Sequence, residues 1–346
     1  MKINHIYEID VLRCIGAVSV LLYHYTFRSL FIGGVRAPMF PILEVVTRYG
    51  FIGLNLFFMI SGFVILFSAF NKSPTSFAIS RIDRLFPQYW VCVTLTTIVI
   101  AFSTDSPISF YHYVMNLTLV NDVFKIPDID VIYWTLHAEL KFYFIIFILL
   151  LVKELKNVHI WLPIWLLITI VYLIFKQPFF MVWFINPFYS SYFISGILYY
   201  LIYSYGLSWR RVSALMVSMT LCIIYSIIEV DGFIRQPTAI DRTVAASLII
   251  LLHIIFFLIA IKRFPFKGSK KLMMAGSITY PLYLLHLRIG KTVYDLLSTH
   301  INKYVLVLGL CLLMILISLG VNYAVENRYK GPMRRVLLSV VPNRLL

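Results

Sequence analysis

A chain of 346 residues that is 61% hydrophobic and 13% charged is not an ordinary soluble domain, which is nearer half apolar and a quarter charged. The composition therefore predicts an all-α, polytopic membrane bundle whose water-exposed parts are short loops. The net charge of +15 does not indicate a nucleic-acid partner in so apolar a chain, because Lys and Arg are typically enriched in cytoplasmic loops of membrane proteins. All four cysteines fall in apolar stretches, so no disulfide framework is expected.

Ten membrane spans are predicted along the chain. They cover about residues 9–27, 49–70, 85–102, 132–152, 158–175, 183–203, 212–229, 241–261, 272–297 and 304–325. If the N-terminus is cytoplasmic, Lys and Arg concentrate in the cytoplasmic segments, which favours an even number of spans with both termini inside. Residues 1–326 are expected to form one membrane domain, and residues 327–346 a basic cytoplasmic tail.

The first span carries two ionisable residues, Arg13 and His24, eleven positions apart. At about 100° and 1.5 Å per residue they lie on one helix face, roughly 16 Å apart along the axis. Asp10, three residues before Arg13, can form an ion pair with it. Ionisable residues inside spans mark functional sites by default. The alternative is that Arg13 extends to the membrane surface and His24 belongs to an interfacial aromatic belt.

Two motifs belong to the second span and the segment after it. Arg81 and Arg84 are three residues apart, so both guanidinium groups face the same way at the cytoplasmic surface. Such a pair suits a phosphate or pyrophosphate, although Lys and Arg at this position can also be plain topological anchors. Within the span, Ser61 and Gly62 predict a close contact between helices.

The fourth span carries a carboxylate, Glu139, in its outer half, roughly level with His24 in the predicted topology. Thr135, Glu139 and Tyr143 share one helix face. A carboxylate here can orient a histidine or match its protonation. The alternative is a structural contact between Glu139 and either Lys141 or a tyrosine.

The ninth span contains a proline followed by a histidine. Pro281 is expected to break or kink the helix near Tyr280, and His286 beyond it is a second candidate for chemistry. The alternative for His286 is a buried histidine bonded to a carbonyl group. The histidines of the chain are scattered without metal-ligand spacing, so no metal is expected.

The two longest outer segments, about 28–48 and 103–131, complete the pattern. The second contains Asp122, Asp128 and Asp130 and is expected to be solvated and rich in turns. It could cover the outer mouth of the bundle or contact a substrate.

Together these motifs resemble the acyltransferase-3 family of membrane acyltransferases. The matching residues are Arg13 and His24, Phe57–Phe58 with Ser61–Gly62–Phe63, Arg81 and Arg84 with Leu85, Pro87 and Tyr89, Trp134 with Glu139 and Phe142–Tyr143, and Ser277 with Tyr280, Pro281, Tyr283, Leu284 and His286. Each motif is short, but five in the same order are specific. The acidic-Lys-Pro ending of the family appears only loosely, as Glu326–Asn327 with a later Pro332.

The resemblance implies an O-acyltransferase of the bacterial cytoplasmic (inner) membrane. It would move an acyl group, usually acetyl, from cytoplasmic acetyl-CoA, its co-substrate, to a hydroxyl of an envelope glycan such as O-antigen, capsule or exopolysaccharide, or to a similar acceptor. Its partners would be acyl-CoA, a glycan or lipid-linked glycan and membrane lipids, with no nucleic acid and no metal.

The resemblance also suggests roles for the residues. His24 is expected to act as general base on the acceptor hydroxyl, with Glu139 orienting it. Arg13, Arg81 and Arg84 are expected to hold the donor, since the distance from Arg13 to His24 is of the order of the pantetheine arm of CoA. In a variant of this chemistry, His24 itself takes the acyl group. The supporting candidates are Asp10, Tyr143, Tyr280 and His286.

Two other functions fit parts of the pattern. A transporter or acyl-donor channel serving a separate transferase also needs intramembrane Arg, His and Glu, but inverted repeats are not evident in the sequence. A non-catalytic scaffold for a polysaccharide machine would leave the aligned ionisable residues unexplained.

Overall fold

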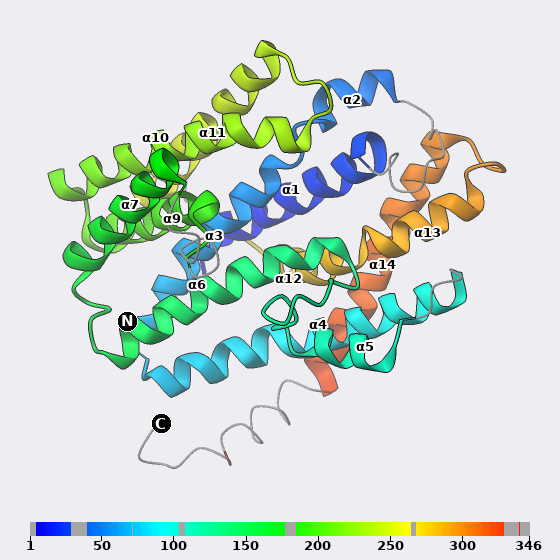
Figure 1. Ribbon diagram of the computed structural model, residues 1–346, viewed down its shortest axis with the longest axis horizontal. Coiled ribbons are helices and arrows are strands. Elements are labelled where there is room, and N and C mark those ends of the chain that lie inside the picture. Colours follow the sequence, from blue (N-terminus) through cyan, green and yellow to red (C-terminus); the bar gives the residue numbers. More distant parts are fainter. Residues whose placement is uncertain are drawn as a thin grey trace. The chain divides into compact units, whose positions relative to one another are not determined.

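The computed structural model describes residues 5–28, 40–70, 72–103, 108–176, 185–263, 268–328 and 339. These ranges are helical and contain no strand, which confirms the predicted all-α fold (Figure 1). The helices are α1 (Tyr7–Tyr23), the π-helical turn η1 (His24–Arg28), α2 (Pro41–Thr47), α3 (Ile52–Ala69), α4 (Pro74–Ser103), α5 (Phe110–Leu117), the 3-10 turn η3 (Val131–Tyr133), α6 (Trp134–Leu151), α7 (Val158–Phe175), α9 (Pro187–Tyr205), α10 (Trp209–Phe233), α11 (Ala239–Ala260), α12 (Lys270–Leu285), α13 (Arg288–Leu297) and α14 (Lys303–Arg328).

Eight helical segments in the described ranges are long and apolar enough to cross a membrane. They are Tyr7–Arg28, Pro41–Ala69, Pro74–Ser103, Val131–Leu151, Val158–Phe175, Trp209–Phe233, Ala239–Ala260 and Lys303–Glu326. The two other predicted spans, 183–203 and 272–297, correspond to α9 and to α12 followed by α13. The chain is therefore a polytopic membrane protein. Parts of both long outer segments (29–39 and 104–107) and nearly all of the predicted tail lie outside the described residues.

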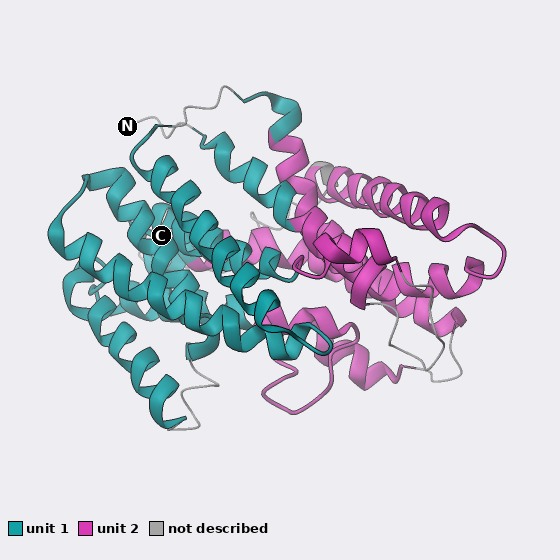
Figure 2. Cartoon of the chain, turned by 90° about the horizontal axis from the view of Figure 1, so that it is seen from above, with its two compact units in different colours: residues 1–16, 51–77, 138–272 teal, residues 17–50, 78–137, 273–346 magenta. Residues whose placement is uncertain are grey.

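The chain divides into two compact units (Figure 2). Unit 1 contains residues 1–16, 51–77 and 138–272, and unit 2 contains residues 17–50, 78–137 and 273–346. The divisions fall inside α1, α4, α6 and α12, so each of these helices contributes residues to both units.

Unit 1 is organised around α9, in which every residue from Ser190 to Ile202 is buried. This helix packs against α3, α7, α10 and α11. Its closest approach is to α3, because a Cβ atom on Gly196 would lie 2.0 Å from the Met59 carbonyl oxygen and one on Gly62 would lie 2.1 Å from the Phe193 carbonyl oxygen. The predicted close helix contact at Gly62 is therefore confirmed, and Gly196 is its partner.

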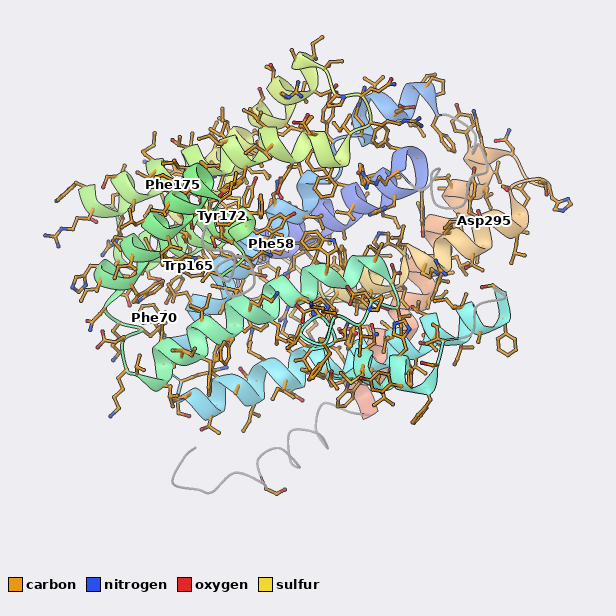
Figure 3. All side chains as sticks on the ribbon, viewed as in Figure 1. Phe58, Phe70, Trp165, Tyr172, Phe175 and Asp295 are labelled. Atoms are coloured by element: carbon orange, nitrogen blue, oxygen red, sulfur yellow. The ribbon has the colours of Figure 1, made fainter. Side chains whose placement is uncertain are left out.

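The side chains of α9 also explain why hydropathy alone does not identify it as a span. A helix that is surrounded by protein can carry hydroxyl groups, provided that each finds a hydrogen-bond partner. Ser190 accepts a hydrogen bond from Trp165 Nε1 (2.9 Å), and Tyr199 lies 2.7 Å from His253 Nδ1. Trp165 is labelled in Figure 3 with Phe58, whose ring packs 5.0 Å from that of Phe193 in α9.

In unit 2, polar side chains connect α4, α12 and α14. Gln88 donates a hydrogen bond to Asn322 (2.7 Å), and Asn322 donates to Ser277 (3.2 Å). Tyr280 donates to the carbonyl oxygen of Leu85 (3.4 Å). Because buried amides are costly to leave unbonded in a membrane, these contacts fix which helices are neighbours.

Of the break or kink expected near Tyr280, a break is absent. Helix α12 continues through Pro281 to Leu285, and the chain is interrupted only at His286 and Leu287 before α13 begins. Proline has the backbone φ angle of a helix and removes a single hydrogen bond, which this helix tolerates. The interruption lies instead where side chains from elsewhere in unit 2 bond the free backbone groups, as described below.

The α3–α9 contact predicts a strong effect of a single methyl group. Gly196→Ala should destabilise the purified protein by about 1–3 kcal/mol, because its Cβ meets rigid backbone. The measurement is the thermal unfolding midpoint in detergent. Gly309→Ala in α14 is the matched control, since nothing lies within 4 Å of its Cβ. Equal midpoints for the two variants would contradict this packing.

Candidate functional site

His24 lies where helix α1 changes to a π-helical turn. The chain is α-helical through Tyr23 and π-helical from His24 to Arg28, a rare geometry that often occurs at functional sites. Thr26 stabilises the turn by donating to the Leu22 carbonyl oxygen and lying 2.7 Å from the Thr47 hydroxyl. Gly50 lies against this end of the helix, where a Cβ would be 2.2 Å from the Ser19 carbonyl oxygen. The predicted helical span over 9–27 is thus present, and its helix geometry changes at His24, the candidate general base.

A second histidine, His286, packs beside His24 in unit 2, with the ring centroids 5.1 Å apart. His286 Nδ1 lies 2.6 Å from the Tyr283 carbonyl oxygen. A carbonyl only accepts hydrogen bonds, so Nδ1 carries the proton and Nε2 presents a lone pair. His286 Nε2 and His24 Nδ1 are both buried and lack hydrogen-bond partners among the described residues. We call these two side chains the imidazole pair.

The interruption between α12 and α13 holds His286 in this position. Tyr25 donates a hydrogen bond to the His286 carbonyl oxygen (2.7 Å). A residue adjacent to His24 therefore bonds a free backbone group of the interruption. Gly290 leaves room for this hydrogen bond, because a Cβ there would lie 2.1 Å from the Tyr25 hydroxyl oxygen and displace that side chain. Tyr25, next to His24 in the first span, therefore contacts the interruption between α12 and α13 at both His286 and Gly290.

Asp130, from the outer segment before α6, completes the support. One carboxylate oxygen accepts from the backbone N–H of Arg288 (2.9 Å) and the other from that of Ile132 (3.4 Å). A carboxylate is favourable at the start of α13, where backbone N–H groups are unpaired. Burial raises the pKa of Asp130 to about 7, and the two backbone hydrogen bonds oppose this shift.

Tyr283 and Thr135 extend the contacts of His286. The Tyr283 ring lies 5.5 Å from the His286 ring, and its hydroxyl accepts from Thr135 (3.0 Å) while donating to the Ile132 carbonyl oxygen (3.3 Å). Thr135, which was expected to share a face with Glu139, therefore contacts the ninth predicted span within unit 2.

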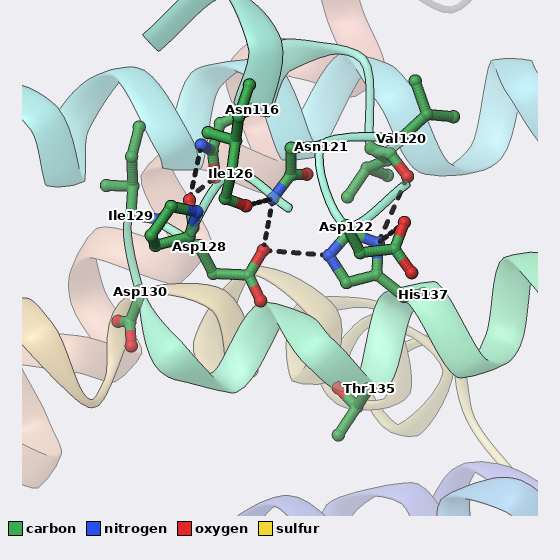
Figure 4. Close-up of polar contacts among 12 residues, drawn as sticks. Asn116, Val120, Asn121, Asp122, Ile126, Asp128, Ile129, Asp130, Thr135 and His137 are labelled. Carbon is green, nitrogen blue, oxygen red and sulfur yellow. Dashed lines mark hydrogen bonds and ion pairs between the residues drawn. The ribbon is translucent and has the colours of Figure 1, made fainter. Parts of the chain in front are cut away.

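The outer segment is tied down by His137 (Figure 4). Its Nε2 lies 2.9 Å from an Asp128 carboxylate oxygen and its Nδ1 lies 3.2 Å from the Leu119 carbonyl oxygen. Asp122 is 3.8 Å from the same Nδ1. Since every neighbour is an acceptor, both ring nitrogens donate when the ring is an imidazolium. Asn121 adds a hydrogen bond to Asp128 (2.9 Å), so the expected solvated segment is held in a defined conformation.

In unit 1, Glu139 accepts hydrogen bonds from Ser61 (2.8 Å) and from Tyr143. The glutamate–tyrosine contact that sequence analysis left open as a structural alternative is thus present, and the expected role of Glu139 in orienting His24 stays a prediction. Asp10 accepts from Arg13 (3.2 Å) and is also bonded to His5, so the predicted ion pair of Asp10 and Arg13 is formed.

The arginine pair lies in unit 2, on helix α4. Arg81 donates to Ser80 (3.4 Å), and Arg84, three residues later, is exposed. Tyr280 contacts the carbonyl oxygen of Leu85, the residue after Arg84. The supporting candidate Tyr280, on α12, therefore contacts α4 at the residue that follows the arginine pair.

Sequence analysis missed a buried polar cluster in unit 1. Glu229 accepts from Asn55 (2.8 Å), and Tyr192 lies 3.5 Å from the same carboxylate oxygen. The signal was available, because Glu229 is a carboxylate inside a predicted span, and such residues deserve the same default attention as Glu139. No recognisable motif surrounds Glu229 in the sequence.

Comparison with known proteins identifies related sequences. A family model described as an acyltransferase domain matches residues 6–323. "Putative acetyltransferase ORF330" from Acidianus two-tailed virus is 23% identical over 295 residues, covering 83% of this chain and 84% of that protein. Peptidoglycan O-acetyltransferase OatA from Listeria monocytogenes is 26% identical over 184 residues, covering 46% of this chain and 27% of that protein. No solved structure matches the chain.

The contacts of His137 predict a local effect of its removal. His137→Ala should loosen the segment around residues 119–130, because hydrogen bonds to charged groups contribute about 1.5–3 kcal/mol. Tryptic cleavage after Lys125, which is exposed, should then be roughly ten- to a hundredfold faster when opening precedes cleavage. His300→Ala changes an exposed histidine in a turn and should cleave like the unmodified protein. Unchanged cleavage in His137→Ala would show that the segment is held by other contacts.

Proposed function

Because the chain belongs to the acyltransferase-3 family of membrane acyltransferases, we propose that it transfers an acetyl group from acetyl-CoA to a hydroxyl of an envelope glycan or a lipid-linked glycan. Both related proteins are named as acetyltransferases, which supports acetyl as the group moved. A peptidoglycan O-acetyltransferase among them supports a glycan hydroxyl as acceptor. We place the chain in the bacterial cytoplasmic membrane with both termini inside, as the distribution of Lys and Arg favours.

The observation that carries this proposal is the imidazole pair. Transfer to a hydroxyl needs a group that can take a proton near neutral pH, and histidine is the side chain best suited to that task. His24 and His286 place two imidazole rings together, each with a buried nitrogen that has no hydrogen-bond partner among the described residues. Buried polar atoms are nearly always bonded, so two adjacent rings that each have an available nitrogen support a role in proton transfer.

The proposed reaction uses His24 as general base. As the acceptor oxygen bonds to the thioester carbonyl carbon, its proton moves to His24. The tetrahedral intermediate then collapses, the carbon–sulfur bond breaks, and the CoA sulfur leaves with the proton returned by His24. The tautomer of His286 leaves the Nε2 lone pair available to stabilise the protonated ring of His24 through a small rotation of either ring.

The donor is proposed to lie against Arg81 and Arg84. CoA carries a pyrophosphate and a 3′-phosphate, and guanidinium groups bind such anions through charge-assisted hydrogen bonds. The exposure of Arg84 supports this role, since an exposed guanidinium group is accessible to a phosphate. Arg13 and Glu139 are kept as further candidates on the strength of the family motifs.

The imidazole pair predicts a specific pattern of activity in variants. His24→Gln should lower the acetyl-transfer rate about 10²–10⁴-fold, because glutamine keeps a polar side chain but cannot accept the proton. His286→Gln should lower it less. The double variant should be no slower than His24→Gln alone, since residues that act as a unit are not additive. The rate is measured as transfer of radiolabelled acetyl from acetyl-CoA to envelope glycan in membrane vesicles.

His300→Gln is the control for the pair, since it changes an exposed histidine in a turn. An active His24→Gln variant would exclude His24 as the base. Label that remains on the protein when acceptor is absent would replace direct transfer with an acyl-histidine intermediate.

The arginine pair predicts a change in donor affinity. Arg81→Gln or Arg84→Gln should raise the apparent dissociation constant for acetyl-CoA roughly ten- to a hundredfold, because each charge-assisted contact contributes about 1.5–3 kcal/mol. Binding is measured by titrating acetyl-CoA into the purified protein. Arg263→Gln removes an exposed arginine after α11 and should bind normally. Normal binding in all three variants would reduce the pair to a topological anchor.

A further inference from the structure

Unit 1 contains a large groove between α7 and α10, with α9 as its floor. It encloses about 1140 Å³, more than the 300–1000 Å³ usual for small-molecule pockets. The floor includes Leu198 and Leu201, one wall includes Leu166, and the opposite wall includes Ala214 and Val217. Both walls pack against α9, so the groove is a feature of unit 1 alone.

One end of the groove is basic. Lys156, His159, Arg210 and Arg211 line it, and none of the described side chains that line the groove is acidic. Lys156 lies in the turn just before α7, His159 is at the start of α7, and the two arginines are at the start of α10. Both helices therefore begin at this end, and their charges gather where the chain enters the membrane.

The arginines are held in place by local contacts. Arg211 donates to the carbonyl oxygens of Tyr205 (3.0 Å) and Gly206 (2.6 Å) at the end of α9. The Arg210 guanidinium lies 5.8 Å from the centre of the Trp209 ring, and Trp209 is itself exposed, as is typical of tryptophan at a membrane interface. The basic end thus has the composition of a headgroup-level site.

The apolar part of the groove is flanked by a surface suited to lipid. Leu167 on α7 and Met216 on α10 are exposed, at 59% and 55%, and both helices are among the eight membrane-spanning candidates. An exposed leucine or methionine on a spanning helix faces hydrocarbon rather than water. A ligand of this groove therefore has long apolar chains at one end and negative charge at the other.

We propose that the groove binds an anionic phospholipid of the leaflet in which α7 and α10 begin. Its headgroup phosphate would contact Lys156 and Arg210, and its acyl chains would lie on Leu198 and Leu201 between the two walls. In the topology favoured by the charge distribution, this is the cytoplasmic leaflet. The proposal does not depend on the transfer reaction, because all of its residues belong to the groove and none to the imidazole pair.

The test compares lipids and variants on the full-length purified protein. Native mass spectrometry after detergent exchange should show retained phosphatidylglycerol, and phosphatidylglycerol should raise the unfolding midpoint more than phosphatidylcholine does. Lys156→Gln/Arg210→Gln should weaken phosphatidylglycerol binding roughly thirtyfold, since each surface charge contributes about a factor of five. Lys270→Gln/Lys271→Gln removes the same charge from exposed positions outside the groove and should bind like the unmodified protein.

A second variant tests the apolar part without altering charge. Ala214→Phe fills the groove and should reduce retention of phosphatidylglycerol while leaving insertion in the membrane intact. Equal retention of phosphatidylcholine, equal binding by the two double variants, or retention of CoA in place of phospholipid would each overturn the proposal. Phe70, which also lines the groove and is labelled in Figure 3, is left unchanged in every variant.

Discussion

The requirement that polar groups inside a membrane find partners within the protein determines how these helices meet. In unit 1, Asn55 of α3 donates to Glu229 of α10. In unit 2, Gln88 of α4 donates to Asn322 of α14. Apolar contacts alone would not distinguish one helix neighbour from another, because lipid chains satisfy an aliphatic surface equally well. The few polar side chains in the spans therefore specify the packing that the many apolar ones only permit.

Against this requirement, the imidazole pair is an exception with a physical meaning. Isolated unbonded atoms also occur among the described residues, for example the Tyr225 hydroxyl and His253 Nε2. His24 and His286 differ because two such nitrogens belong to rings that pack together. A base must be able to gain and lose a proton, so it cannot have all of its positions saturated by fixed partners.

Sequence patterns predicted the helices, but not where the helices are interrupted. Apolar runs and motif spacing are local, so they gave the spans and the pairing of Asp10 with Arg13. The interruption at His286 depends on Asp130 and Tyr25, which are remote in sequence. Pro281 was the only local indication of a break. The helix nevertheless continues through this proline, because one missing hydrogen bond is a small perturbation within a packed helix. The π-helical turn at His24 likewise depends on contacts from Thr47 that no local pattern encodes.

The two kinds of ionisable residue in the spans are suited to different tasks. Glu139 already accepts hydrogen bonds from Ser61 and Tyr143, which hold its carboxyl group in one orientation. His286 is held by a single hydrogen bond from Nδ1, and its other nitrogen remains available. A carboxyl group held by two donors can orient a neighbouring group, whereas an imidazole with an available nitrogen can transfer a proton. The contrast supports assigning the proton transfer to histidine and restricting Glu139 to a supporting role.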